Sequence, residues 1–483
     1  VESRFRWSPE RLSFGASYAR SRQRALRFDQ IVEQPSDALI EPTRSPRESL
    51  EGAFEIVFRP FETLSAQVDL VSIRDLLDPE KAIADSDVQG LLSDERLIVG
   101  GVDLGWQTNQ VLRTRMSFDP RFGDWVRTAF GWQTFYFSDR RATFVERSVD
   151  DVGDTLVVLL RDASGRRDFT GQITLIPAAI LGGSGSGASG GSGLGRVLES
   201  MMGAIDPITV TYQDGVTSSF DRDPVDPVFS YRFGFADRDG YLFMGADTAP
   251  TLTERGGWTV RSSVRLPAAL QVGVNYGLTT ANTLDRRSDR SLRREIWPDL
   301  NLSLPTWSLP NQTLIRRVSL SGGFQRIRQK SVFGGFGQQK RFQRDERIPV
   351  EVSLVWGGGV STSYRASFTR GEGGDPTGST DRNRENHTFS LTALMRPPSR
   401  WAARLTRPIT VSGILQYASD RNCRTTATRA ECVPFLDELI RSLVFRVETA
   451  ISGTEVRLQL SYTDRQSFVG LQAGSSQFQF GIF

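Results

Sequence analysis

Hydrophobic and polar residues alternate in many parts of the chain, most clearly near its C-terminal end. In residues 455–463 the even positions Val456, Leu458, Leu460 and Tyr462 are apolar or aromatic, whereas the odd positions are polar or charged. Because successive side chains of a β-strand point to opposite faces, this segment is predicted to be a strand with one apolar face and one polar face. The alternation recurs roughly twenty times along the chain, more often than a soluble sandwich requires. A β-barrel with lipid outside and water inside requires this pattern.

The connections between the predicted strands fall into two kinds. Short turns that contain Pro or Gly, residues suited to hairpin geometry, are expected at residues 59–62, 267–268, 357–359 and 450–454. Longer polar stretches are expected at residues 20–48, 75–95, 281–289 and 371–384. Short turns on one side and long loops on the other are typical of outer-membrane barrels. Residues 1–483 are therefore predicted to be all-β and to form a single large antiparallel transmembrane β-barrel, or a C-terminal portion of one.

One stretch interrupts the strand pattern. Residues 182–193 are rich in Gly and Ser and are expected to form a flexible segment. They lack the Gly-Lys-Ser/Thr ending of a phosphate-binding loop, so nucleotide binding is not expected. Residues 194–205 follow with apolar positions at helical spacing and predict a short amphipathic helix. We expect this helix to rest on the barrel rim or at the membrane interface, and a partner-binding helix is the alternative.

Composition argues against a helical membrane protein but allows a membrane barrel. Hydrophobic residues make up 38% of the 483 residues, and the mean hydropathy is −0.30. No run of about 18 apolar residues occurs, as a membrane-spanning helix would require. A barrel does not need such a run, because only alternate residues of its strands face lipid. The net charge is +3 without a basic cluster, so nucleic-acid binding is not expected.

Arginine supplies nearly all of the positive charge. The only lysines are Lys81, Lys330 and Lys340. Genomic base composition is one explanation for this bias, and arginines that line a wet lumen are the functional alternative. From the phase of the strands, polar side chains are assigned to the lumen, and the candidates are Arg365, Arg457 and Gln459.

The sequence offers little for catalysis or metal binding. His387 is the only histidine, which excludes a histidine-based zinc site, and no Gly-x-Ser-x-Gly turn accompanies it. We expect His387 in a loop or at the rim, and we predict no catalytic residue, no cofactor and no enzymatic activity. Two acidic clusters are expected to be turns, with Ca²⁺ binding as the alternative. They comprise Asp221, Asp223 and Asp226, and Asp237 and Asp239.

The two cysteines, Cys423 and Cys432, are separated by a short polar segment that fits no zinc-binding pattern. We favour a disulfide that closes a loop tip, which implies an oxidising compartment, over two unpaired thiols. Aromatic residues near strand ends predict a girdle at the membrane interface, with a sandwich core as the alternative. These residues are Phe130, Trp132, Tyr136, Trp297, Trp356, Tyr417 and Tyr462.

Several short motifs follow one another along the first two thirds of the chain. They are Phe58-Arg59-Pro60 with Leu64, Ser72-Ile73-Arg74-Asp75-Leu76, Ile205-Asp206-Pro207-Ile208 with Tyr212, Tyr231-Arg232-Phe233-Gly234-Phe235, and Trp297-Pro298-Asp299-Leu300. Together they resemble the SprA/Sov family of outer-membrane proteins. The motifs occur in the order expected for the C-terminal part of that family. They span residues 58–300, whereas the final third of the chain shares only the general style of a barrel. The near absence of lysine sets this chain apart from familiar members.

The resemblance implies a giant single-chain barrel that serves as the translocon of the type 9 secretion system and is linked to gliding motility. It also implies a bacterial outer-membrane location, with loops exposed at the cell surface. The implied partners are membrane lipid, secreted protein cargo, accessory gating or plug proteins, and further strands from a missing N-terminal part or from another subunit. Family members are several times longer, and this chain begins at Val1 without a signal peptide, so we expect a C-terminal fragment.

Three alternatives are compatible with the sequence. The first is another outer-membrane transport barrel, such as a porin or a transporter of lipopolysaccharide or small solutes. The second is a structural or adhesion protein of the cell surface whose long loops bind partners. A soluble enzyme is the third and the least favoured, because no catalytic motif supports it.

Overall fold

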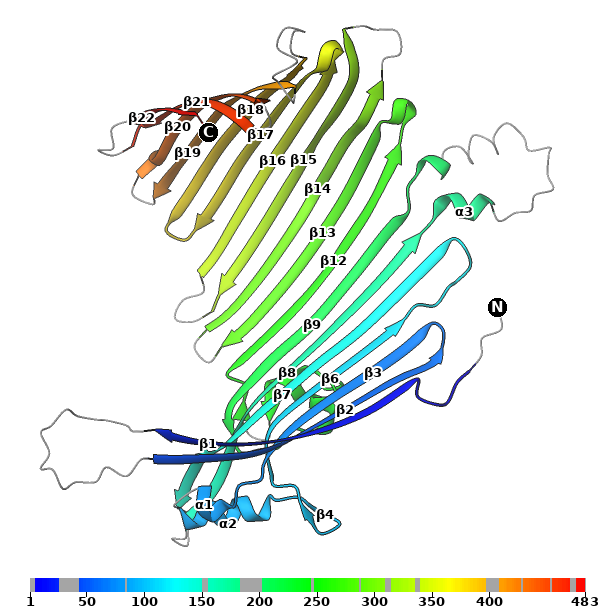
Figure 1. Cartoon of the computed structure of the whole chain (residues 1–483), viewed down its shortest axis with the longest axis vertical. Coiled ribbons are helices and arrows are strands. Elements are labelled where there is room, and N and C mark those ends of the chain that lie inside the picture. Colours follow the sequence, from blue (N-terminus) through cyan, green and yellow to red (C-terminus); the bar gives the residue numbers. More distant parts are fainter. Residues whose placement is uncertain are drawn as a thin grey trace, which may run out of the picture.

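A computed structural model of the chain is dominated by one large antiparallel sheet (Figure 1). The structure describes residues 5–25, 43–82, 85–149, 155–182, 202–244, 247–285, 288–308, 314–334, 339–396, 408–426, 429–451, 454–469 and 475–482. Within these ranges eighteen strands pair in chain order, each antiparallel to the next. In Figure 1 the sheet runs from β1 at the bottom to β22 at the top. The predicted fold class is confirmed.

The strands of this sheet are long. They are β1 (Arg11–Ala25), β2 (Thr43–Phe61), β3 (Leu64–Asp75), β6 (Trp106–Phe118), β7 (Val126–Val149), β8 (Thr155–Leu175), β9 (Ile208–Asp223), β12 (Thr251–Arg265), β13 (Gln271–Asp285), β14 (Ser288–Ser308), β15 (Ile315–Phe333), β16 (Gln339–Trp356), β17 (Val360–Asp375), β18 (Gly378–Met395), β19 (Ile409–Thr426), β20 (Arg429–Ile451), β21 (Thr454–Ser467) and β22 (Ser475–Ile482).

Short elements occupy some of the connections. The segment between β3 and β6 contains α1 (Pro79–Ala82), α2 (Ser86–Asp94), β4 (Ile98–Val99) and β5 (Val102–Asp103). The segment between β9 and β12 contains α5 (Phe229–Arg232), α6 (Arg238–Leu242), β10 (Phe243–Met244) and β11 (Asp247–Thr248). The remaining short elements are α3 (Pro177–Gly182), η1 (Pro267–Ala269) and η2 (Gly357–Gly359). No helix in the described ranges has the length and hydropathy needed to span a membrane.

The sequence predicts a flexible segment and a helix at residues 182–205, and most of these residues lie outside the described ranges. Gly182 is the last residue of α3, and the rest of the Gly/Ser-rich segment 182–193 is not described. Of the helix predicted at 194–205, residues 202–205 are described; residues 202–204 are helical, whereas Ile205 forms an isolated β-bridge with Val264 on β12. The segment therefore ends beside β12, and the length of the helix stays a prediction.

The connections are divided between the two ends of the sheet as the sequence predicts. All four predicted short turns lie at one end, which we call the turn end; they join β2 to β3, β12 to β13, β16 to β17 and β20 to β21. Gly358 and Gly359 make one of these turns possible, because their φ angles of 81° and 83° are left-handed values that favour glycine. All four predicted long stretches lie at the opposite end, which we call the insert end. Residues 176–207 and 396–408 also connect strands at the turn end, so longer connections occur there too.

Two of the predicted long loops are mostly strand. In 281–289 only residues 286–287 lie between β13 and β14, and in 371–384 only residues 376–377 lie between β17 and β18. The sequence suggested loops there because both alternating sets of side chains are polar. A strand that extends beyond a membrane meets water on both faces and loses the alternation that marks it. Each of these strands therefore continues beyond the part in which apolar and polar residues alternate.

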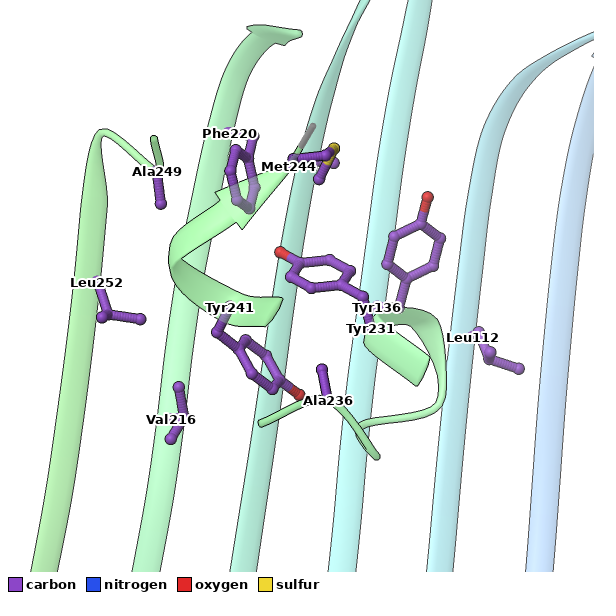
Figure 2. Packing of buried hydrophobic residues seen from close by; sticks show 11 residues of the cluster. Leu112, Tyr136, Val216, Phe220, Tyr231, Ala236, Tyr241, Met244, Ala249 and Leu252 are labelled. Atoms are coloured by element: carbon purple, nitrogen blue, oxygen red, sulfur yellow. The ribbon is translucent and has the colours of Figure 1, made fainter. Parts of the chain in front are cut away.

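The segment between β9 and β12, which we call the 224–250 insert, folds back over one face of the sheet (Figure 2). Tyr231 on α5 and Tyr241 on α6 are 2% and 0% exposed. Their neighbours on the sheet include Leu112, Tyr136, Ala163, Val216, Phe220 and Leu252, from strands β6 to β12. Gly165 on β8 leaves room for this packing, because a Cβ there would lie 2.7 Å from Tyr231 Cζ. Burial of about ten apolar side chains explains why α5 and α6 pack on the sheet.

Replacement of Gly234 by Val should detach the 224–250 insert from the sheet. Gly234 has a φ of 76°, and a Cβ there would collide with Thr134 on β7. Strained backbone and a steric clash together should cost about 2–5 kcal/mol. Limited trypsin digestion should then cleave at Arg232 and Arg238 much faster than in the unmodified chain. Gly413→Val is the control, because no atom lies within 4 Å of a Cβ at Gly413; equal protection in both variants would contradict the packing.

Candidate functional site: a two-faced wall

The eighteen-stranded sheet has one apolar face and one polar face, in the phase that the sequence predicts. We define the apolar face by Leu458, Leu460 and Tyr462 on β21, and the polar face by Arg457 and Gln459 on the same strand. Residues that pair across neighbouring strands lie on the same face, so the registers of the paired strands extend each face over the whole sheet. Leu460 is opposite Phe445 on one side and Phe480 on the other. At the other edge, Phe14 on β1 is opposite Phe54, which is opposite Leu70.

Large side chains of the apolar face are exposed. Leu415 is 52% exposed and Phe480 is 63% exposed. Others on this face that are more than a third exposed include Leu12, Phe14, Met116, Phe118, Trp258, Leu300, Ile348, Tyr364, Phe389, Leu443, Phe445, Leu458, Leu460 and Phe478. A continuous apolar surface of this extent far exceeds what a soluble monomer exposes, and it marks contact with a membrane or a large partner.

The apolar part of this face has the height of a membrane. On β17 it runs from Val360 to Phe368, nine residues, and the next residue in phase is Arg370. A transmembrane strand needs about 9–11 residues. The same change from apolar to charged occurs on neighbouring strands, where Ile348 is followed in phase by Glu346, and Tyr462 by Asp464. We call this band of the apolar face, from the turn end to the change in polarity, the apolar belt.

Aromatic rings line the edge of the apolar belt that faces the insert end. Trp132, Phe169, Tyr212 and Trp258 follow one another across β7, β8, β9 and β12, with ring centroids 6.5, 6.1 and 4.5 Å apart in turn. Membrane proteins place such rings at the lipid–water interface. Two residues of the predicted girdle lie elsewhere. Tyr136 is 1% exposed beneath the 224–250 insert, because α5 covers its strand, and Trp356 is at the turn end of β16.

His387 belongs to this aromatic edge rather than to a loop. It lies within β18 on the apolar face, opposite Ala366 and Tyr417. Its Nδ1 is 2.8 Å from the hydroxyl oxygen of Tyr364, and its ring contacts Phe368 at a centroid distance of 5.3 Å. The predicted loop position is therefore wrong, since the strand continues through residues that look polar in sequence. This environment of aromatic neighbours gives His387 a packing role at the belt edge.

The polar face carries hydrogen bonds and ion pairs from strand to strand. The three candidate lumen residues all lie on it. Arg365 pairs with Glu351 at 2.7 Å, Arg457 pairs with Glu448 at 2.7 Å, and Gln459 accepts a hydrogen bond of 3.0 Å from Arg446. The Arg365 and Arg457 side chains are 68% and 49% exposed. Exposed pairs contribute about 0–1 kcal/mol each, so these charges mainly keep the polar face hydrated.

Two adjacent arginines beyond the belt edge each pair with one of two inserts, the 224–250 insert and the segment between β3 and β6, which we call the 76–105 insert. Arg161 on β8 is 4% exposed and pairs with Asp226 of the 224–250 insert. It lies opposite Arg140 on β7, which pairs at 2.6 Å with Glu95 at the end of α2. Burial, together with the nearby charge of Arg140, lowers the pKa of Arg161 to about 10, so it stays protonated at neutral pH. Sequence reasoning missed this contact because its partners are far apart in the chain.

The 224–250 insert also contains two tyrosines that stay protonated. Burial raises the pKa of Tyr241 to about 12, and it raises the pKa of Tyr231 further. The Tyr231 hydroxyl and Ser218 Oγ share a hydrogen bond of 3.0 Å. Tyr231 belongs to a motif that the resemblance to SprA/Sov proteins singled out, although the sequence alone did not identify it as a core residue. Its burial at a helix–sheet contact explains the need for a large ring at this position.

The acidic clusters act as caps and pairs. Asp237 accepts a hydrogen bond of 2.9 Å from the Gly240 backbone at the start of α6, and Asp223 accepts one of 2.8 Å from the Val225 backbone. Asp226 pairs with Arg161 and Arg232. In the part of the chain that the structure describes, the one set of three potential metal ligands within 4.8 Å of one another is Asp381 with Cys423 and Cys432.

Cys423 and Cys432 form a disulfide with Cα atoms 5.4 Å apart. Cys423 is on β19 and Cys432 is on β20, close to the connection between these strands. The bond therefore joins two paired strands near their tip. Because both sulfurs are in the disulfide, they do not offer thiolates to a metal.

Comparisons with known proteins add little to this description. No protein-family model matches the chain, and no curated protein matches it. Among solved structures, the chain is similar to the siderophore receptor PirA from Acinetobacter baumannii, with a TM-score of 0.26 and 9% sequence identity. The match covers 86% of this chain and 66% of the receptor, so the chain spans just under two thirds of the receptor's length. At this level of similarity no conclusion about function follows.

An arginine placed on the apolar face should prevent membrane insertion. Leu460 lies near the middle of the belt on β21, and Leu460→Arg puts a charge where the strand meets lipid. The expected cost is about 2–4 kcal/mol. The adjacent Ser461→Arg puts the same charge on the polar face and should insert normally. Heat-dependent mobility in SDS gels after refolding into vesicles measures the folded fraction. Loss of folding in Ser461→Arg, with normal folding of Leu460→Arg, would show that the two faces are exchanged.

Proposed function

We propose that this chain forms the wall of an outer-membrane transport barrel, with the polar face lining a water-filled passage. The observation that supports this most directly is the apolar belt, which is continuous from β1 to β22 and is bounded by aromatic rings and charges. Open strand edges are not tolerated in lipid, because their backbone groups would lack hydrogen bonds. The edge strands β1 and β22 therefore pair with each other or with further strands from the same protein or another subunit.

The lengths of the strands support one orientation in the membrane. β7 and β8 contain 24 and 21 residues, which at about 3.3 Å per residue reach well beyond a belt of about 25 Å. The excess length, the 224–250 insert and the segment between β3 and β6 lie at the insert end. Outer-membrane barrels place short turns toward the periplasm and long extensions outside, so we assign the insert end to the cell surface.

The finer proposal is a protein-conducting channel of the SprA type, which serves type 9 secretion and, by resemblance, gliding motility. Two observations support it. Two residues of the motifs that resemble SprA/Sov proteins make packing contacts. Tyr231 is buried and anchors the 224–250 insert, and the ring of Trp297 on β14 lies 6.0 Å from that of Tyr276. The wall is also wide, since 16–18 strands are enough to enclose an aqueous channel. Secreted polypeptide would be the cargo, and gating or plug proteins would prevent leakage.

Removal of one ion pair from the polar face tests the passage directly. Arg457→Leu should change conductance or cargo passage markedly while insertion stays normal, because Arg457 and Glu448 both face the polar side and their exposed pair adds little stability. Conductance in planar bilayers and the heat-modified gel band measure the two effects separately. Loss of insertion with unchanged passage in the folded fraction would show that this face does not line the passage.

Deletion of the gene distinguishes the transport proposals from the adhesion alternative. Accumulation of secreted proteins in the periplasm supports a protein-conducting role. Normal secretion with lost uptake of small solutes supports a porin-like role, and normal secretion with lost attachment supports adhesion. Release of the protein from cells without detergent would contradict the membrane location itself.

A further inference from the structure

A hollow of about 460 Å³ lies on the apolar face of the sheet, between the aromatic edge of the apolar belt and the 224–250 insert. Its walls come from β8, β9, β12 and β13 and from Arg238, the first residue of α6. The volume is within the range of about 300–1,000 Å³ that ligand sites occupy. Because the apolar face meets lipid in the proposed membrane location, an occupant of this hollow comes from the bilayer.

Three rows of paired residues cross the hollow, and their character changes from apolar to polar with distance from the belt. From the belt outward they are Tyr212, Trp258 and Leu278, then Asp214, Gly256 and Thr280, then Val216, Glu254 and Asn282. A molecule that fills the hollow therefore meets rings and aliphatic groups at one end, and charges and hydrogen-bonding groups at the other. This is the lining that an amphiphile requires.

Gly256 makes room in the middle row. A Cβ at this position would lie 3.3 Å from Thr280 Oγ1. Glycine weakens a strand, and within a strand it often marks the close approach of a ligand or of another part of the chain. On the belt side, the rings of Tyr212 and Trp258 have centroids 4.5 Å apart, and Trp258 is 47% exposed. These rings offer an apolar surface to an acyl chain that leaves the hollow toward the belt.

Two ion pairs lie at the polar end of the hollow, so its charges balance. Arg167 pairs with Asp214 at 3.3 Å, and Arg238 pairs with Glu254 at 2.8 Å. Arg255 also borders the hollow, but the phase of β12 assigns its side chain to the polar face. A ligand of one sign would leave half of these groups facing a like charge. A headgroup that carries both signs complements both kinds of group.

Arg238 keeps donors for such a headgroup. Its bond to Glu254 uses Nε, and among the residues that the structure describes its two terminal nitrogens have no partner. The Arg238 side chain is 61% exposed, so these N–H groups can reach a phosphate, which guanidinium groups bind strongly. The Asp214 and Glu254 side chains are 36% and 24% exposed, which leaves carboxylate oxygens within reach of an ammonium group.

We propose that this hollow binds the headgroup of a phospholipid that carries both a phosphate and an ammonium group, as phosphatidylethanolamine does. The phosphate contacts Arg238, and the ammonium group contacts Asp214 and Glu254. An acyl chain then lies over Trp258 on the belt. The proposal needs the membrane location of the chain but not its transport role. A lipid held in this way links the 224–250 insert to the edge of the belt.

Native mass spectrometry of the whole purified chain measures which lipids it retains on release from detergent. The probes are phosphatidylethanolamine, phosphatidylglycerol and lipid A, each at the same concentration. Phosphatidylethanolamine should be retained at least about fivefold more than the other two, because they offer phosphates to the carboxylates of the hollow without an ammonium group. Equal or greater retention of phosphatidylglycerol or of lipid A would overturn the class of headgroup.

Two variants test the place of binding. R238Q should lower the retention of phosphatidylethanolamine by about fivefold or more, because it removes the donors for the phosphate. Gly256→Leu should lower retention similarly, because it fills the hollow without a change in charge. Protection of Arg232 from trypsin, compared with the unmodified chain, shows that the 224–250 insert stays packed in both variants. Unchanged retention in either variant would overturn the site.

Arg261 provides the matched control. It is on β12, as Glu254 is, but it is in phase with the polar face. R261Q removes one positive charge and should change the retention of phosphatidylethanolamine by less than about twofold. Equal loss in R261Q and R238Q would overturn the site, because net charge alone would then explain binding.

Conductance of the same preparations in planar bilayers separates this proposal from the proposed function. A chain that conducts ions but shows no preference for phosphatidylethanolamine would reject the lipid site alone. A preference that depends on Arg238, in a chain that does not conduct, would support the lipid site and reject transport alone.

Discussion

The hydrogen bonding of the backbone in lipid is the constraint on which the rest of this molecule depends. A strand in hydrocarbon has no water to satisfy its N–H and C=O groups, so each must pair with a neighbour on both sides. Among the described residues, eighteen strands pair in order along the sequence, and every strand except β1 and β22 has a neighbour on both sides. Side chains are then free to differ between the faces, and the apolar face contacts lipid while the polar face stays wet. The amphipathic pattern is a consequence of this division.

The same constraint explains where the fold could be predicted from sequence and where it could not. In the apolar belt the two faces meet different solvents, so the strand around Leu460 was identified from alternation alone. Beyond the belt both faces meet water, and residues 371–384 looked like a loop although most of them continue β17 and β18. His387 was misplaced for the same reason. Alternation in the local sequence reveals a strand only where its two faces differ in polarity. Where both faces are polar, the same strand cannot be told from a loop.

The inserts were harder to predict because their packing is decided by residues far apart in the chain. Tyr231 is buried against strands that are distant in sequence, and Tyr136 is covered by α5 instead of joining the aromatic girdle. Arg161 pairs with Asp226, about sixty residues away, and no local pattern reveals such a contact. The result is a second layer of structure over the apolar face, placed beyond the belt edge where lipid no longer covers the sheet. The inserts thereby cover part of a surface that would otherwise expose apolar side chains to water.

The charges of the polar face are balanced along its length, and this balance bears on what the face can hold. At the height of the belt, Arg365 and Arg457 have carboxylate partners, so the surface is hydrated and nearly neutral. Beyond the belt, arginines and carboxylates again lie together, and Asp375 interacts with Arg341 and Arg424. Because exposed pairs are individually weak and screened by salt, such a face stays wet without holding a charged solute tightly.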